Sequence, residues 1–164
     1  MSISPEIISL IEEIKNNKTH GASQLARQAA EALKVIAEYS SADSVEQFLL
    51  EQREVGDKLM SARPAMAPVF NIIARLLKAI LEKSAEMDLP SIRRFAISRA
   101  DEVIGESRQA IAQIAQYGSE LITDGDRIMT HSYSSTVVAV LQEAFTRDRN
   151  IEVITYPVRS GTQR

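Results

Sequence analysis

The chain has 164 residues, of which 45% are hydrophobic, with 22 acidic and 19 basic residues and a formal net charge of -3 at pH 7. This length suits one domain or one domain with part of a second, and the near balance of charge argues against nucleic acid or an anionic membrane as partner. The absence of cysteine excludes disulfides and thiolate zinc sites, and the lack of a long apolar run or signal-peptide pattern leads us to expect a cytoplasmic protein.

Apolar residues recur at helical spacing in five stretches before any strand pattern appears. The first follows Ser4-Pro5, with Pro5 near the first helical position and four isoleucines on one face: Ile7, Ile8, Ile11 and Ile14. An alanine-rich stretch comes next, and prolines interrupt the pattern later at Pro64 and Pro90. We therefore expect the remaining helices around residues 25–36, 45–60, 67–87 and 91–117.

The hydrophobic period changes after Asp124-Gly125-Asp126, which is a turn signal. Residues 127–131 have the pattern of a buried strand, a helix with Val137 and Leu141 on its apolar face follows, and residues 151–154 begin a second strand. Strand, helix and strand within about thirty residues predict a parallel βαβ unit. The predicted fold is mainly α, with a bundle of about five helices over residues 1–123 and the start of an α/β domain over 124–164.

Two strands alone rarely form a stable parallel sheet. We expect this sequence to be part of a longer protein, with most of the second domain beyond Arg164. Two alternatives are open: another chain completes the sheet, or the strands lie against the helices. The strand at 151–156 would then have an open edge, which favours pairing with another chain in an oligomer.

The bend between the first strand and its helix is rich in hydroxyl groups, contributed by Ser132, Ser134 and Ser135. The first N–H groups of a helix lack partners and carry partial positive charge, so this place suits a phosphate or carboxylate. The alternative is that one serine is simply the helix N-cap. No GxGxxG pattern supports a dinucleotide, and we expect no cofactor.

Only two histidines are present, His20 and His131, and without cysteine they do not predict a metal site. His131 precedes Ser132, but neighbours along a strand point to opposite faces. A catalytic serine–histidine pair is therefore not expected.

Three stretches in register resemble one known family. They are Gly21-Ala22-Ser23 with the alanine-rich helix behind it, Ser61-Ala62-Arg63-Pro64 followed by Asn71, and the segment from Gly125 to Val138. They look like the Arg-Gly-Ala loop, the Ala-Arg-Pro turn and the first strand and loop of the alpha, beta and delta subunits of eukaryotic translation initiation factor 2B. That family also holds the ribose-1,5-bisphosphate and methylthioribose-1-phosphate isomerases.

The resemblance implies a helical domain followed by a Rossmann-like domain, with a sugar phosphate bound in the cleft between them in the isomerases. On that analogy Gly21, Ala22 and Arg63 line the phosphate side, and Ser134 and Ser135 lie at the helix N-terminus. Guanidinium and free helix N–H groups are both phosphate donors. The alternative for Arg63 is a loop arginine that ties helix ends together through their carbonyls.

The chain departs from the isomerases of the family at several positions. Ser132 matches the position of their cysteine, and a hydroxyl is a far weaker acid than a thiol. Their partner aspartate belongs to a later part of the fold, and His20 stands where the Arg-Gly-Ala loop has arginine. Residues 156–159 match the Arg-Pro pair after the second strand only loosely.

Three functional hypotheses follow. The first is a non-catalytic regulatory or assembly subunit of the initiation factor 2B type, which contacts protein subunits and keeps a sugar-phosphate or nucleotide-phosphate pocket. The second is an aldose–ketose sugar-phosphate isomerase, or its N-terminal part, with Ser132 as its weak catalytic candidate. The third is a helical interaction domain without a ligand. We favour the first, with no direct role for nucleic acid or membrane.

Overall fold

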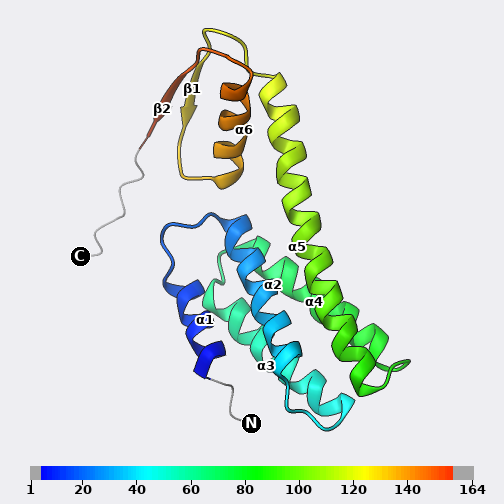
Figure 1. Cartoon of the computed structure of the whole chain (residues 1–164). Helices are drawn as coiled ribbons and strands as arrows, with labels where there is room; N and C mark the ends of the chain where they lie inside the picture. Colours follow the sequence, from blue (N-terminus) through cyan, green and yellow to red (C-terminus); the bar gives the residue numbers. More distant parts are fainter. Residues whose placement is uncertain (1–4, 157–164) are drawn as a thin grey trace, which may run out of the picture. The chain divides into compact units, whose positions relative to one another are not determined.

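The computed structural model describes residues 5–156 (Figure 1). Five helices precede the first strand, and a strand, a helix and a strand follow, so the predicted mainly α order is confirmed. In chain order the elements are α1 (Pro5–Asn16), α2 (Ala22–Tyr39), α3 (Val45–Ala62), α4 (Ala67–Ser84), α5 (Leu89–Glu120), β1 (Arg127–Thr130), α6 (Ser135–Thr146) and β2 (Glu152–Thr155). None of the helices in the described range is long and apolar enough to cross a membrane.

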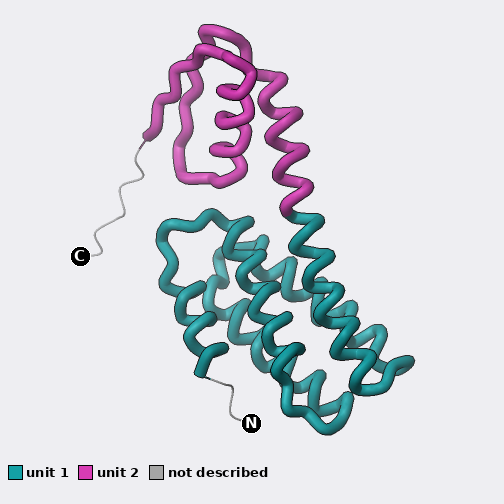
Figure 2. Tube along the Cα trace, viewed as in Figure 1, with its two compact units in different colours: residues 1–107 teal, residues 108–164 magenta. Residues whose placement is uncertain are grey.

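The chain forms two compact units, Met1–Ser107 and Arg108–Arg164 (Figure 2). The division falls within α5, so the first part of this helix belongs to unit 1 and its last part to unit 2. The domain boundary expected at residue 123 from the sequence stays a prediction.

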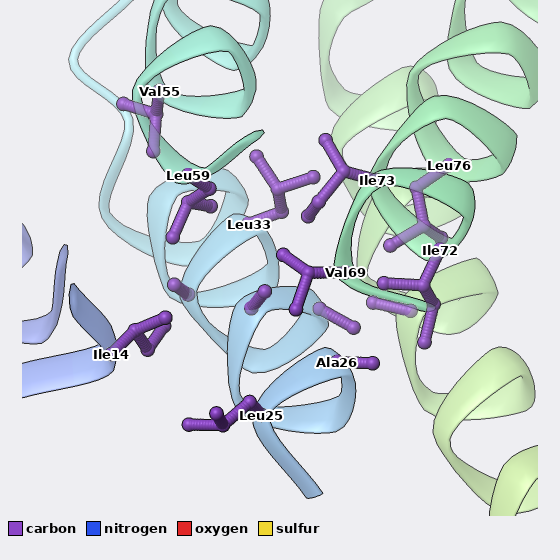
Figure 3. Packing of buried hydrophobic residues seen from close by; sticks show 14 of the residues in the cluster. Ile14, Leu25, Ala26, Leu33, Val55, Leu59, Val69, Ile72, Ile73 and Leu76 are labelled. Atoms are coloured by element: carbon purple, nitrogen blue, oxygen red, sulfur yellow. The ribbon is translucent and has the colours of Figure 1, made fainter. Parts of the chain in front are cut away.

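Helix α2 is the centre of unit 1, because it contacts α1, α3 and α4 and has eight buried residues, against five each in α3 and α4. Its alanines at 26, 29, 30 and 32 are all buried, which allows the neighbouring helices to approach closely. Larger side chains from α1, α2, α3 and α4 fill the remaining space, as Figure 3 shows: Ile14, Leu25, Leu33, Val55, Leu59, Val69, Ile73 and Leu76. The alanine-rich stretch of the sequence therefore marks the innermost helix.

Helices α3 and α4 come close together at Gly56, which is buried. A Cβ added to this glycine would lie 2.6 Å from Leu77 Cδ1 and 3.2 Å from Ile73 Cγ2. The lack of a side chain at Gly56 is therefore a packing requirement.

Helix α5 joins unit 1 through both apolar and charged contacts. Ile92 and Ala96 belong to a cluster with Phe48 and Ile80. The Glu106 carboxylate lies 3.0 Å from Arg75 of α4 and 3.2 Å from Arg99 of α5. The apolar cluster and the ion pair with Arg75 hold the unit 1 part of α5 against the other helices of that unit.

Unit 2 contains a two-stranded parallel sheet, as the sequence predicts, with Ile128 opposite Val153 and Met129 opposite Ile154. Helix α6 lies alongside the strands (Figure 1). A Cβ on Gly118 of α5 would lie 2.8 Å from Val140 of α6, so the end of α5 packs closely against α6.

The expectation of a buried first strand was wrong. Ile128 is half-buried, but Met129 is 72% exposed, because no described element covers the other face of the sheet. Two apolar residues that were expected on the inward face of their helices, Ile8 and Val137, are also exposed.

Candidate functional site

The first group of candidate residues is at the N-terminus of α2. Gly21 is the N-cap, is buried, and its carbonyl accepts hydrogen bonds from the N–H groups of Gln24 and Leu25 at 3.0 and 3.1 Å. The N–H groups of Ala22 and Ser23 have no hydrogen-bond partner among the described residues. The first turn contains no acidic residue, so the partial positive charge of the helix end is not neutralised there.

The loop before α2 is held by Asn17. Its Oδ1 accepts hydrogen bonds from the backbone N–H of Thr19 at 3.0 Å and of His20 at 2.7 Å. Asparagine commonly forms such turns with its own backbone two residues ahead. This side chain therefore fixes the path of the chain into Gly21.

Arg63, directly after α3, joins this loop to the end of α1. Its Nε donates to the carbonyl of Ile14 at 2.9 Å, and its Nη2 donates to the carbonyl of Asn17. Arg63 thus ties helix ends together through their carbonyls, which was one of the two interpretations of this residue. A guanidinium carries five N–H donors, and these two bonds leave the others unpaired among the described residues. The phosphate role therefore stays open to Arg63.

His20 is half-buried beside the same loop. Its Nδ1 lies 3.2 Å from Asn17 Nδ2 and 3.3 Å from Gln28 Oε1. A neutral ring can accept from Asn17 or donate to Gln28 through Nδ1, but not both. The tautomer therefore decides whether the ring bonds Asn17 within the loop or Gln28 of α2.

The second group of candidate residues is at the N-terminus of α6 in unit 2. Ser134 is the N-cap, and its Oγ accepts from the N–H of Val137 at 3.4 Å. One serine of the bend, Ser134, is therefore the helix N-cap, which was one of the two interpretations of these serines. The N–H groups of Ser135 and Thr136 have no partner among the described residues, so the helix end retains two free donors.

Ser132 lies between β1 and α6 and is exposed. No described side chain hydrogen-bonds to it. The ring of His131 instead lies 6.2 Å from that of Tyr156, centroid to centroid. Both residues follow the end of β1, and no hydrogen bond between their side chains is present among the described residues.

One face of the sheet in unit 2 is uncovered among the described residues. Residues two apart on a strand share a face, so side chains from both strands meet there in pairs. Across the two strands it carries an ion pair, an apolar pair and a ring pair: Arg127 with Glu152 at 2.6 Å, Met129 with Ile154, and His131 with Tyr156. We call these six residues the open face. Parallel sheets are normally covered on both faces.

The structure thus connects Arg63 with the loop that precedes Gly21 and Ala22 in unit 1. Ser132, Ser134 and Ser135 lie together in unit 2. Sequence reasoning missed Asn17, although an Asn that precedes a Thr-His-Gly turn is a recognisable signal.

The sequence profile of the Initiation factor 2 subunit family, IF-2B, matches residues 18–163. The chain belongs to this family. It is 32% identical to the ribose 1,5-bisphosphate isomerase of Thermococcus kodakarensis, an alignment that covers 99% of this chain and 51% of that protein. The chain thus spans about half the length of the curated relatives that it matches.

Two solved structures of the family show the same fold. The translation initiation factor eIF-2B of Pyrococcus horikoshii is 29% identical with a TM-score of 0.77, over 93% of this chain and 50% of that one. A subunit of the tetrameric eIF2B beta2-delta2 complex of C. thermophilum is 26% identical with a TM-score of 0.76, over 96% of this chain and 53% of that one. Family members of this fold therefore include both isomerases and subunits of oligomeric complexes.

Proposed function

We propose that this chain is a non-catalytic, initiation factor 2B-like subunit that assembles with protein subunits, a second copy of itself included. The observation that supports this most is the open face of unit 2. Met129 is 72% exposed and Ile154 37% exposed on one face of a parallel sheet. Parallel sheets seldom expose apolar side chains on a face to water. Within the described residues β2 pairs only with β1, so this face and the outer edge of β2 are available to another protein surface.

The surroundings of Ser132 support the non-catalytic part of the proposal. Proton transfer by a serine requires an adjacent base that removes its proton. Ser132 is exposed and has no hydrogen bond to a described side chain, and the His131 ring is paired with Tyr156. Nothing in the described chain activates this hydroxyl.

We further propose that the subunit binds a phosphorylated small molecule. Gly21, Ala22 and Arg63 would contribute from unit 1, and Ser134 and Ser135 from unit 2. The support is the set of unused donors: two helix N-termini with free N–H groups and a guanidinium with unpaired N–H groups.

A ribose 1,5-bisphosphate isomerase is the second candidate, because the relative of that name is 32% identical over nearly the whole chain. Such an enzyme would move a proton and a carbonyl between adjacent carbons of the sugar without a cofactor.

The test is turnover of ribose 1,5-bisphosphate by the purified chain and by Ser132→Ala, with Ser41→Ala as the exposed-serine control. We expect no turnover by any of them. Turnover that falls sharply in Ser132→Ala but not in Ser41→Ala would establish the isomerase instead. If the sugar bisphosphate also leaves the thermal midpoint unchanged, the chain is a helical interaction domain without this ligand.

A further inference from the structure

We propose that Asn17 is a positioning residue for phosphate binding, because it joins Arg63 and the N-terminus of α2 into one preorganised set of donors. This inference rests on the proposed phosphate-binding role. It concerns unit 1 alone, where all the contacts that carry it lie.

The first step is that Arg63 uses only some of its N–H donors for bonds to the backbone. Nε and Nη2 lie on the same side of a guanidinium, and here that side donates to the carbonyls of Ile14 and Asn17. Both carbonyls are at the C-terminal end of α1, where backbone oxygens lack intrahelical partners. The remaining donors, on Nη1 and Nη2, form the other edge of the fork, which matches two oxygens of a phosphate. Bonds to one edge thus orient the other.

The second step is the double role of Asn17. Its backbone carbonyl accepts from Arg63, and its side-chain Oδ1 accepts from the N–H groups of Thr19 and His20. The same half-buried residue therefore holds the guanidinium on one side and the loop into Gly21 on the other.

The third step connects this loop to the free N–H groups. His20 directly precedes Gly21, and its ring Nδ1 is within hydrogen-bond distance of Asn17 Nδ2 and of Gln28 Oε1 in α2. Whichever of these two bonds the tautomer forms, it adds to the backbone bond from the His20 N–H to Asn17 and holds the loop at the start of α2. The N–H groups of Ala22 and Ser23 are therefore held in a fixed relation to Arg63. Binding groups that are fixed before the ligand arrives lose less conformational entropy on binding, which raises affinity.

The test uses Asn17→Ala, which removes Oδ1 and leaves the backbone carbonyl, and Asn17→Ser, whose hydroxyl makes the same kind of turn more weakly. The control is Asn16→Ala. Asn16 is an adjacent, exposed asparagine whose Nδ2 donates only to Glu12, at 3.2 Å. The Kd for ribose 1,5-bisphosphate is measured by calorimetry, and ribose without phosphate serves as a second control. Circular dichroism checks that each variant is folded.

We expect Asn17→Ala to weaken binding of ribose 1,5-bisphosphate about tenfold, the factor that corresponds to one or two lost hydrogen bonds. Asn17→Ser should lie between Asn17→Ala and wild type, and Asn16→Ala should equal wild type. A role in stability alone would lower the thermal midpoint of Asn17→Ala but leave the Kd of the folded protein unchanged. Unchanged affinity in both Asn17 variants would overturn the inference and leave the phosphate-binding proposal intact. Absence of binding by the wild-type chain would overturn both.

Discussion

Gly56 is the residue at which α3 and α4 leave no room for a methyl group. Gly56→Ala should lower the free energy of unfolding of unit 1 by about 1–3 kcal/mol, the usual cost of an overpacked core. The reason is that a Cβ would lie 2.6 Å from Leu77 Cδ1, and Leu77 is itself packed against the core. Urea denaturation measures the change.

The control for this substitution is Gly105→Ala in α5. Gly105 is exposed and helical, and a Cβ there meets nothing within 4 Å. Alanine should therefore stabilise the helix by about 0.5–1 kcal/mol through its better helix propensity. The same Gly→Ala change should therefore lower stability at position 56 and raise it at position 105. Equal changes in stability at the two positions would contradict the packing explanation.

The sequence indicated which residues were candidates for the site, but it did not decide the role of each one. Arg63 and Ser134 were each given two interpretations, and the structure shows the helix-end bonds of Arg63 and the cap of Ser134. The choice could not come from the sequence, because the Arg63 partners lie far away in it, at Ile14 and Asn17. Phosphate binding by these residues is untested.

Helix α6 begins at a side-chain cap that can be tested directly. Ser134→Ala removes the acceptor for the Val137 N–H and should lower the stability of unit 2 by roughly 0.5–1 kcal/mol, the lower part of the usual range because the bond is 3.4 Å long. Ser135→Ala is the matched control, since no described residue hydrogen-bonds to its side chain and alanine favours helix. Thermal unfolding of the two variants should therefore differ, and equal midpoints would mean that the cap contributes nothing.

The contact between α4 and α5 predicts a pH dependence. Hydrogen bonds from Arg75 and then Arg99 lower the pKa of the Glu106 carboxyl below its ordinary value of 4.5. A lowered pKa in the folded state means that the ion pairs stabilise the protein above about pH 4.5, and that this contribution is lost as pH falls through the folded pKa.

Glu106→Gln should therefore be less stable than wild type at pH 7, and the two should converge in acid. The effect should be small, because the ion pairs are exposed to water. Unfolding at a series of pH values tests this, with Glu13→Gln as the control, whose carboxylate is exposed and makes no ion pair in the described chain. A difference that grows in acid would contradict the assignment.

Elements were the level at which sequence reasoning worked best. Helical periodicity, proline breaks and the turn at Asp124-Gly125 predicted five helices followed by strand, helix and strand. Exposure was less predictable: Phe145 of α6 is 57% and Ile114 of α5 49% exposed, although both fit an apolar face. Periodicity shows which side of a helix is apolar, but not whether a neighbour covers it.

On the scale of the whole molecule, unit 2 carries most of the exposed large apolar side chains of the described range. They include Leu121 at 85%, Met129 at 72%, Tyr117 at 64% and Tyr133 at 63%. Exposed apolar area of this density commonly marks a surface for another protein. The family relationship is consistent with this, since one solved relative is a subunit of a tetrameric complex.

The account is tested most directly by sedimentation velocity of the chain over a range of concentrations, with Met129→Lys and Leu50→Lys as comparison variants. Met129 lies on the open face, and Leu50 is an equally apolar, 59% exposed residue of α3 in unit 1. We predict that wild type and Leu50→Lys associate as concentration rises and that Met129→Lys stays monomeric. A wild-type chain that sediments as a monomer at every concentration would contradict assembly through the open face.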